Sequence, residues 1–276
     1  MSEFYVTLPL HADRPAQRPG DPFDQLAQVG RAAELAALTG ALAPFDPEGD
    51  ESLVVSAALL RQSRHLRLVA GIHPAAATPV YAAKISASLQ RFSGGRLDWW
   101  LQADLPPAVA RAHGDFHTGA DRQVRAEEFL TVARGVWTTP GYTFRGRFFE
   151  VLDGGFQPPL SGRPFPRVFL SGDPDLSVHH ADVHVYTHGQ PVAPLPGVEL
   201  GLRVRVLARE DDHEAVRPAG FDGLSGSYES VAAELRRYEE LGVSHFFLEA
   251  EPYLEETYRL GEHLLPLLAR ETADAR

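Results

Sequence analysis

The stretch from Leu241 to Leu268 constrains the fold more than any other part of the chain. Leu241-Gly242 ends a helix, because glycine accepts the left-handed conformation that is common at helix ends. Residues 243–248 form a short apolar run rich in strand formers, which is typical of a strand buried on both faces. A charged loop with Pro252 follows, and leucines then recur at helical spacing. A helix, a buried parallel strand, a charged loop and a closing helix predict the last unit of a (β/α) barrel.

The rest of the chain repeats this alternation of strand and helix. A chain of 276 residues fits one large domain, and a hydrophobic fraction of 44% is ample for its core. We therefore predict a single TIM-type (β/α)8 barrel over residues 1–276. The predicted strands are residues 4–8, 41–43, 66–71, 97–102, 167–170, 183–186, 199–207 and 243–248. The predicted helices are Asp21 to Leu38, Glu51 to Arg64, Pro79 to Phe92, Asp121 to Trp137 and Tyr228 to Leu241.

Two regions depart from the alternation. Residues 142–156 place Arg145-Gly146 between two aromatic-rich runs, which predicts a hairpin insertion. The segments that join predicted strands five, six and seven are too short or too rich in proline for full helices. We expect reduced helices there, with the bare outer faces of the strands covered by the hairpin or by a partner subunit.

Composition excludes several classes of protein. A net charge of −11 argues against a nucleic-acid surface, which needs clustered Lys and Arg. The absence of cysteine excludes disulfides, thiolate catalysis and cysteine-ligated metals. No apolar segment reaches membrane-spanning length, and the N-terminus shows no signal peptide. We therefore expect a cytoplasmic protein that binds neither nucleic acid nor membrane.

Charged side chains at the ends of predicted strands are candidate site residues. Arg203 and Arg205 share one face of a strand, where they could form an anion site for a phosphate or an acidic substrate. Alternatively, they pair with Glu249 or Glu251 on the neighbouring strand. His11 ends the first strand, where it could serve in acid–base chemistry or fix a loop by a hydrogen bond.

Two further groups of side chains have simpler interpretations. His184 and His188 lie on one face of a strand but roughly 13 Å apart, too far to bind one metal ion. No metal site is predicted among these histidines or their neighbours His179 and His180. Trp99 and Trp100 alternate across a strand, so one indole should pack under the helices and the other should fill the barrel.

Motifs along most of the chain carry a family resemblance. The chain resembles the bacterial luciferase-like flavin monooxygenases, in particular their alkanesulfonate monooxygenase branch. The matching segments are Leu8-Pro9-Leu10-His11, Ser93-Gly94-Gly95-Arg96, Asp121-Arg122, the hairpin at 142–151, the strand at 201–206 and the closing Tyr258-Arg259 and Gly261-Glu262 helix.

The resemblance implies a function and a set of site residues. It implies a luciferase-like barrel that takes reduced FMN from a flavin reductase, activates dioxygen and oxidises a small organic, anionic substrate. Its implied catalytic residues are His11, His188, Arg205 and Glu251, and its implied cofactor-binding residues are Arg203, Ser171, Gly172 and Gln102. It implies a transient reductase partner and a homo- or hetero-oligomer with another luciferase-like chain.

The chain departs from the family pattern at some of these positions and at neighbouring ones. Asp173-Pro174 replaces part of a phosphate-binding loop, and a carboxylate repels phosphate while proline lacks an N–H. His188, Glu251, Arg205 and Trp100 stand where the family has Trp, Tyr, His and Asn, and residues 208–226 lack its long mobile loop. Two alternatives therefore stay open: a non-catalytic barrel that supports an intact homologue, and a flavin-free enzyme acting on an acidic small molecule.

Overall fold

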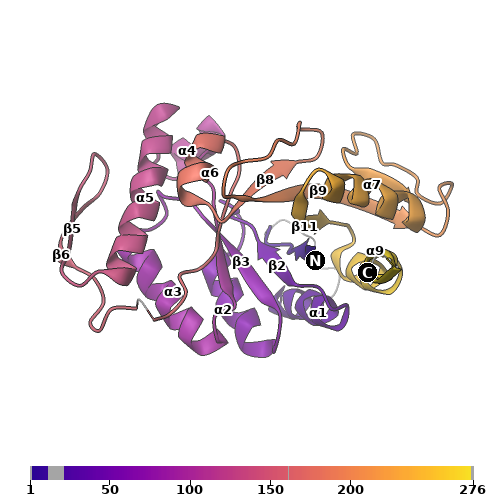
Figure 1. The fold of residues 1–276 in the computed structure, drawn as a ribbon, viewed down its shortest axis with the longest axis horizontal. Helices are drawn as coiled ribbons and strands as arrows, with labels where there is room; N and C mark the ends of the chain where they lie inside the picture. The colour runs from indigo at the N-terminus through magenta and orange to yellow at the C-terminus, as the bar shows by residue number, and fades with distance from the viewer. Residues whose placement is uncertain (1, 12–21, 161, 275–276) are drawn as a thin grey trace.

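A computed structural model describes residues 2–11, 22–160 and 162–274. Eight parallel strands close into a barrel, because β8 pairs with β9 and so joins the two ends of the sheet (Figure 1). The predicted (β/α)8 barrel is confirmed. In barrel order the strands are β1 (Glu3–Thr7), β2 (Gly40–Ala43), β3 (Arg67–Ile72), β4 (Leu97–Leu101), β7 (Val168–Leu170), β8 (Val183–Thr187), β9 (Glu199–Arg209) and β11 (Val243–Glu249).

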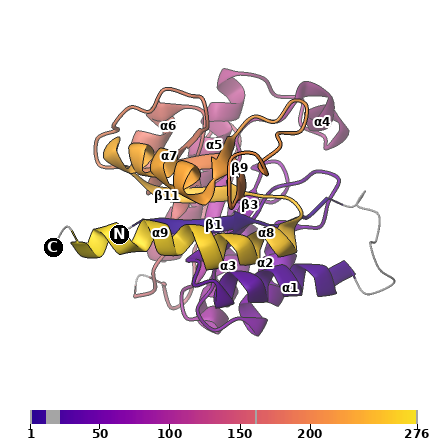
Figure 2. The same cartoon turned by 90° about the vertical axis from the view of Figure 1, so that its right-hand side faces the viewer.

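Helices cover the outside of most strands, as the apolar periodicity predicts. Figure 2 shows the C-terminal helices running alongside α1, across the outer side of β1. The first helix ends before the predicted Leu38 because Ala37 adopts a positive φ of 55°; its predicted start at Asp21 lies outside the described residues. The helices are α1 (Pro22–Leu35), α2 (Ser52–Gln62), α3 (Pro79–Ser93), α4 (Pro107–Ala112), α5 (Ala120–Thr138), α6 (Pro174–His180), α7 (Tyr228–Glu240), α8 (Tyr253–Arg259), the π-helical turn η1 (Leu260–Leu264) and α9 (Leu265–Asp274).

The predicted reduction of helices around β8 is also present. Residues 188–198, all of which the structure describes, contain no helix between β8 and β9. The segment after β7 does contain a helix, the short α6, which was not predicted from the sequence. Asp173 begins it by accepting the Asp175 N–H at 2.9 Å, and Pro174 occupies the first turn. A further strand, β10 (Leu224–Ser227), pairs in parallel with the far end of β9 and was not predicted.

The predicted hairpin is formed by β5 (Tyr142–Arg145) and β6 (Glu150–Gly154). It lies against α5, on the side away from β8 and β9 (Figure 1). The expectation that the hairpin covers the strands with few helices is therefore wrong. The buried carboxylate of Glu128 on α5 holds the turn by accepting three backbone N–H groups, from Arg147 at 2.6 Å, Phe148 at 2.8 Å and Phe149 at 3.0 Å.

Glu128→Gln is expected to loosen the hairpin and to destabilise the protein by about 2 kcal/mol, because an amide has one acceptor oxygen where the carboxylate has two. Urea unfolding and amide hydrogen exchange at Phe148 and Phe149 measure the effect. Glu127→Gln is the matched control, since the Glu127 side chain is 59% exposed. Unchanged exchange at both amides in Glu128→Gln would contradict this account of the hairpin.

Aromatic side chains fill the interior of the barrel. Phe247 stacks on Tyr5 with centroids 4.7 Å apart and meets Trp100 edge-on at 4.8 Å, and Phe169 lies 5.4 Å away. Trp99 points outward, where its indole N–H donates to Ser86 at 2.8 Å. The prediction that one indole packs under the helices and the other fills the barrel is confirmed.

Charged side chains close the end of the barrel at which the strands begin. Asp98 is fully buried and accepts two hydrogen bonds from the Arg67 guanidinium, at 2.8 and 2.6 Å. Arg167 lies between Asp98, at 3.6 Å, and Glu3, at 2.8 Å. The two arginines compensate the charge of the buried Asp98 carboxylate, which is a structural role. In barrels of this kind the active site lies at the carboxyl ends of the strands.

Candidate functional site

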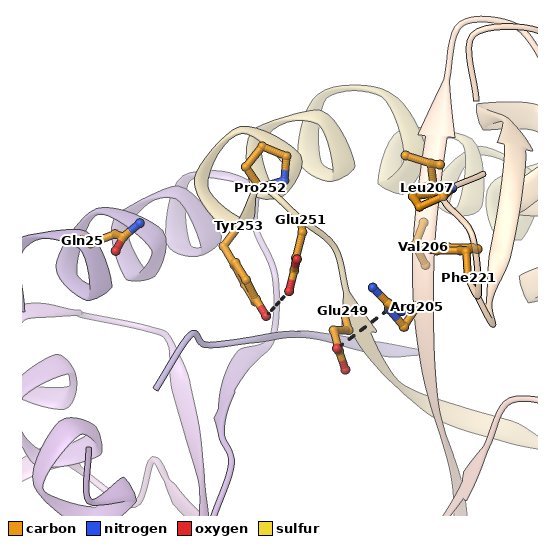
Figure 3. A pocket seen from close by; sticks show the side chains of 10 residues that line it. Gln25, Arg205, Val206, Leu207, Phe221, Glu249, Glu251, Pro252 and Tyr253 are labelled. Atoms are coloured by element: carbon orange, nitrogen blue, oxygen red, sulfur yellow. Dashed lines mark hydrogen bonds and ion pairs between the residues drawn. The ribbon is translucent and has the colours of Figure 1, made fainter. Parts of the chain in front are cut away.

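The loops after β9 and β11 enclose a pocket of about 590 Å³ at the carboxyl end of the barrel (Figure 3). Its lining includes Arg205 from β9, Phe221 from the following loop, and Glu249, Glu251 and Tyr253 from the end of β11 and the loop after it. Pockets of 300–1,000 Å³ are typical of small-molecule sites, and this is the end at which barrel enzymes place their sites.

The two arginines of β9 share one Glu on β11. Arg203 donates to Glu249 at 3.1 Å, whereas the Arg205 Nε lies 4.0 Å from the same carboxylate. The guanidinium of Arg205 also lies over the ring of Phe221, 5.2 Å from its centroid. Arg203 therefore forms the ion pair with Glu249 that was one of the two alternatives. Arg205 lies farther from Glu249, so its interpretation as an anion site stays open. Both side chains are 43% exposed.

Glu251 is brought to the same pocket as Arg205. Figure 3 shows the Glu251 carboxylate and the Tyr253 phenol pointing toward each other, and the phenol donates at 2.8 Å. Both residues precede or begin α8, so the helix start fixes their backbone. A carboxylate hydrogen-bonded to a phenol can hold a proton beside a bound ligand.

His11 follows β1 at the same end of the barrel. Its Nδ1 lies 2.9 Å from Oδ2 of Asp46, in the loop after β2. Burial raises the pKa of Asp46, but the hydrogen bonds from the Glu48 N–H and from His11 outweigh it and the pKa is lowered. Asp46 was not among the predicted site residues; its place just after a buried strand was the signal that could have identified it.

His188 is not brought together with Arg205 and Glu251. Val183 and Val185 of β8 point into the barrel, and His188 lies outside it, against α7. Its Nδ1 lies 3.0 Å from the Tyr238 hydroxyl, and it lines a separate pocket of about 810 Å³. A role for His188 in catalysis stays a prediction.

The other predicted cofactor residues lie along the rim and do not line the Arg205 pocket. Ser171 and Gly172 are exposed after β7, beside Asp173, whose carboxylate already accepts the Asp175 N–H at 2.9 Å. Gln102 follows β4 and donates to the carbonyl oxygen of Asp104 at 3.2 Å.

His179, His180, His184 and His188 do not gather as the ligands of a metal ion would. Within the described part of the chain, no three His, Cys, Asp or Glu side chains gather as a metal site would require. His184 is buried behind β8, its Nδ1 is 2.6 Å from the Ser177 hydroxyl, and burial lowers its pKa. Across the same described residues, no helix combines the length and the apolar character needed to span a membrane.

Comparisons with known proteins agree with this architecture. EDTA monooxygenase (EmoA) from Chelativorans sp. BNC1 superposes with a TM-score of 0.82 at 15% identity, covering 98% of this chain and 94% of that one. Riboflavin lyase (RcaE), solved with modified FMN and riboflavin, gives 0.79 at 15% identity over 98% and 92%. Monooxygenase RslO1 from Streptomyces bottropensis gives 0.77 at 19% identity over 97% and 100%. At such identities these structures establish the fold alone.

The sequence itself matches a family model. Residues 1–177 match the model of the luciferase-like monooxygenases, which is more than half of the 276-residue chain. This match does not distinguish the alkanesulfonate branch from the others. The chain belongs to the luciferase-like monooxygenase family.

Proposed function

We propose that this chain is a flavin-dependent monooxygenase that uses reduced FMN, supplied by a flavin reductase, to oxidise a small organic anion. The observation that carries the proposal is the pocket over β9 and β11, in which Arg205 lies above Phe221 beside Glu249 and Glu251. Family membership and a structural neighbour solved with modified FMN support the flavin. We further propose a cytoplasmic location, because the proposed reductase would draw on the NADH of the cell interior.

The pocket residues fit a flavin mononucleotide in part. A phosphate needs a cationic or N–H donor, which Arg205 provides, and a flat ring system needs aromatic surfaces, which Phe221 and Tyr253 provide. The loop after β7 does not fit a phosphate, because Asp173 places a carboxylate there. We therefore assign the phosphate contact to Arg205. The reduced flavin, when bound, supplies the electrons that activate dioxygen.

The protein's own groups bind and orient the ligand. Glu249 holds Arg203 in an ion pair at 3.1 Å, whereas Arg205 lies 4.0 Å from the same carboxylate. An incoming anion therefore competes less with Glu249 for Arg205 than for Arg203. Glu251, with the Tyr253 hydroxyl at 2.8 Å, can hold a proton at the edge of the pocket. This division of roles makes Arg205 the residue whose replacement tests the proposal best.

Arg205→Gln is expected to weaken FMN binding by about 10- to 100-fold, because a charge-assisted hydrogen bond is worth about 1.5–3 kcal/mol. Riboflavin, which lacks the phosphate, should bind the variant and the wild type equally. Fluorescence quenching and calorimetry with oxidised and anaerobically reduced flavins measure both affinities. Arg217→Gln, in the separate pocket of His188, is the control. Equal losses for both flavins would contradict the phosphate assignment.

Turnover tests the function as a whole. With a flavin reductase, NADH and candidate organic anions, we expect oxygen consumption that depends on the added anion. The absence of FMN binding to the isolated chain up to millimolar concentration would overturn the proposal for that chain.

A second function is favoured by a different observation. Trp100 is only 8% exposed and packs edge-on against Phe247, so it fills the centre of the barrel, and Asp173 occupies the loop after β7. Both features suit a non-catalytic barrel that supports an intact homologue as a subunit. Such a subunit should co-purify with a luciferase-like chain that carries the complete set of family residues, and should show no flavin-dependent turnover alone.

A further inference from the structure

The loop after β9 returns to the side of β9 at Arg205. The loop ends where β10 begins, and β10 pairs in parallel with β9, with Leu224 opposite Val206. The residue before Leu224 therefore lies beside Arg205. It has to be glycine, because a Cβ on Gly223 would lie 2.3 Å from the carbonyl oxygen of Arg205 and 2.8 Å from its Cβ. The backbone that leads into β10 is thus fixed closely against Arg205.

A tight turn in the same loop places an aromatic ring over the guanidinium. The Phe221 N–H donates to the carbonyl oxygen of Pro218 at 3.0 Å, and Gly220 has a positive φ of 75°, which glycine adopts readily. Phe221 therefore lies between this turn and the close contact of Gly223 with β9. Its ring centroid is 5.2 Å from the guanidinium carbon of Arg205, and both side chains line the pocket (Figure 3).

The contacts of the Arg205 guanidinium leave one of its edges for a ligand. The Nε lies 4.0 Å from the Glu249 carboxylate, which is beyond hydrogen-bonding distance, and the Phe221 ring covers one face of the group. None of its N–H groups donates a hydrogen bond to another residue of the described ranges. A guanidinium is a planar fork that binds anions through two N–H groups at once. The two Nη atoms form the edge directed away from Glu249.

We propose that Phe221 is a positioning residue that holds the Arg205 guanidinium by a cation–π contact, so that its two Nη atoms meet the anionic group of the ligand. This inference rests on the proposed function, in which that group is the phosphate of FMN. A free arginine side chain loses conformational freedom when it binds an anion, and this loss weakens binding. The negative face of the Phe221 ring orders the guanidinium before the ligand arrives.

A double-mutant cycle of Phe221→Leu and Arg205→Gln tests the positioning role, because leucine keeps an apolar cover but has no π face. We expect Phe221→Leu to weaken FMN binding about 2- to 10-fold more when residue 205 is arginine than when it is glutamine. Riboflavin, which lacks the phosphate, should lose affinity by the same factor in both backgrounds, so a direct contact of the ring with the flavin cancels. Phe221→Tyr keeps the π face and should bind FMN as the wild type does. Calorimetry and fluorescence quenching measure these affinities.

Phe148→Leu is the matched control, because Arg147 lies over the Phe148 ring at the same 5.2 Å but on the hairpin, away from the pocket. It should leave both flavin affinities unchanged. An equal effect of Phe221→Leu on FMN in both backgrounds, or the same coupling with riboflavin, would overturn the role of Phe221.

A flavin-free measurement separates this proposal from the proposed function. If FMN binds to no variant, the proposed function fails, and inorganic phosphate becomes the probe. Its binding is followed by NMR of the Arg205 Nε–H, which Arg205→Gln identifies. Weaker phosphate binding in Phe221→Leu than in the wild type would support the positioning role, whereas an equal or absent response in both would overturn it.

Discussion

Asp98→Ala is expected to destabilise the protein by about 3–4 kcal/mol, because removing one member of a buried ion pair leaves its partners without charge compensation. Asp98 is fully buried, bonds the Arg67 guanidinium at 2.8 and 2.6 Å, and accepts the Arg167 backbone N–H at 3.2 Å. The Arg67 and Arg167 side chains remain 28% and 29% exposed, so water reaches them in part. This exposure places the expected loss in the lower half of the range for buried pairs.

Urea unfolding monitored by circular dichroism measures the loss. The control is Asp121→Ala, whose carboxylate pairs with Arg147 at 2.6 Å but at the surface, with exposures of 35% and 62%. Such a pair contributes about 0–1 kcal/mol. A similar small loss for both variants would show that the strand-start end of the barrel does not depend on the Asp98 charge network.

Phe247→Ala is expected to cost about 3–5 kcal/mol, since a fully buried phenyl ring is replaced by a cavity. Phe247 has no exposed surface, and its ring contacts Tyr5, Trp100 and Phe169 at centroid distances of 4.7, 4.8 and 5.4 Å. Three aromatic neighbours that pack on one ring cannot collapse easily into the space it leaves. We also expect weaker flavin binding, because Glu249 lies two residues further along the same strand and shapes the pocket.

Phe247→Leu separates the cavity from the loss of aromatic contacts. Leucine retains most of the volume, so we expect a loss of about 1.5 kcal/mol. Thermal and urea unfolding of both variants, with flavin titration of each, measure the two effects. A Phe247→Ala loss no larger than that of Phe247→Leu would mean that the barrel interior repacks freely.

Much of the fold was accessible to sequence reasoning because its signals are local. Most barrel strands are short apolar runs bounded by turn residues, and Gly242 and Pro79 mark a helix end and a helix start within a few residues of their observed positions. The short helix α6 was missed because seven residues give too little periodicity to recognise. The strand β10 was missed because Leu224–Ser227 has one apolar residue, and only the exposed edge of the long β9 makes it a strand.

The sequence predicted the candidate site only where the alternation of side chains along a strand decides which residues share a face. Arg203 and Arg205 share a face because side chains alternate along β9, and the same rule predicted that His184 and His188 share a face, without deciding which one. The resemblance nevertheless grouped His188 with Arg205, which the structure does not do. The position of His188 depends on α7, whose Tyr238 meets it from 50 residues further along the chain.

The sequence by itself determined the barrel, its eight strands and most of its helices, and the charged residues on β9 and at the end of β11. These follow from apolar spacing and turn chemistry over a few residues at a time. Only the tertiary structure decided that Glu249 pairs with Arg203, that Trp100 fills the barrel and that Asp46 meets His11 across 35 positions of the chain. The two polar contacts follow from the direct pairing of β9 with β11 and of β1 with β2, whereas Trp100 lies in an interior because β8 pairs with β9 and closes the barrel.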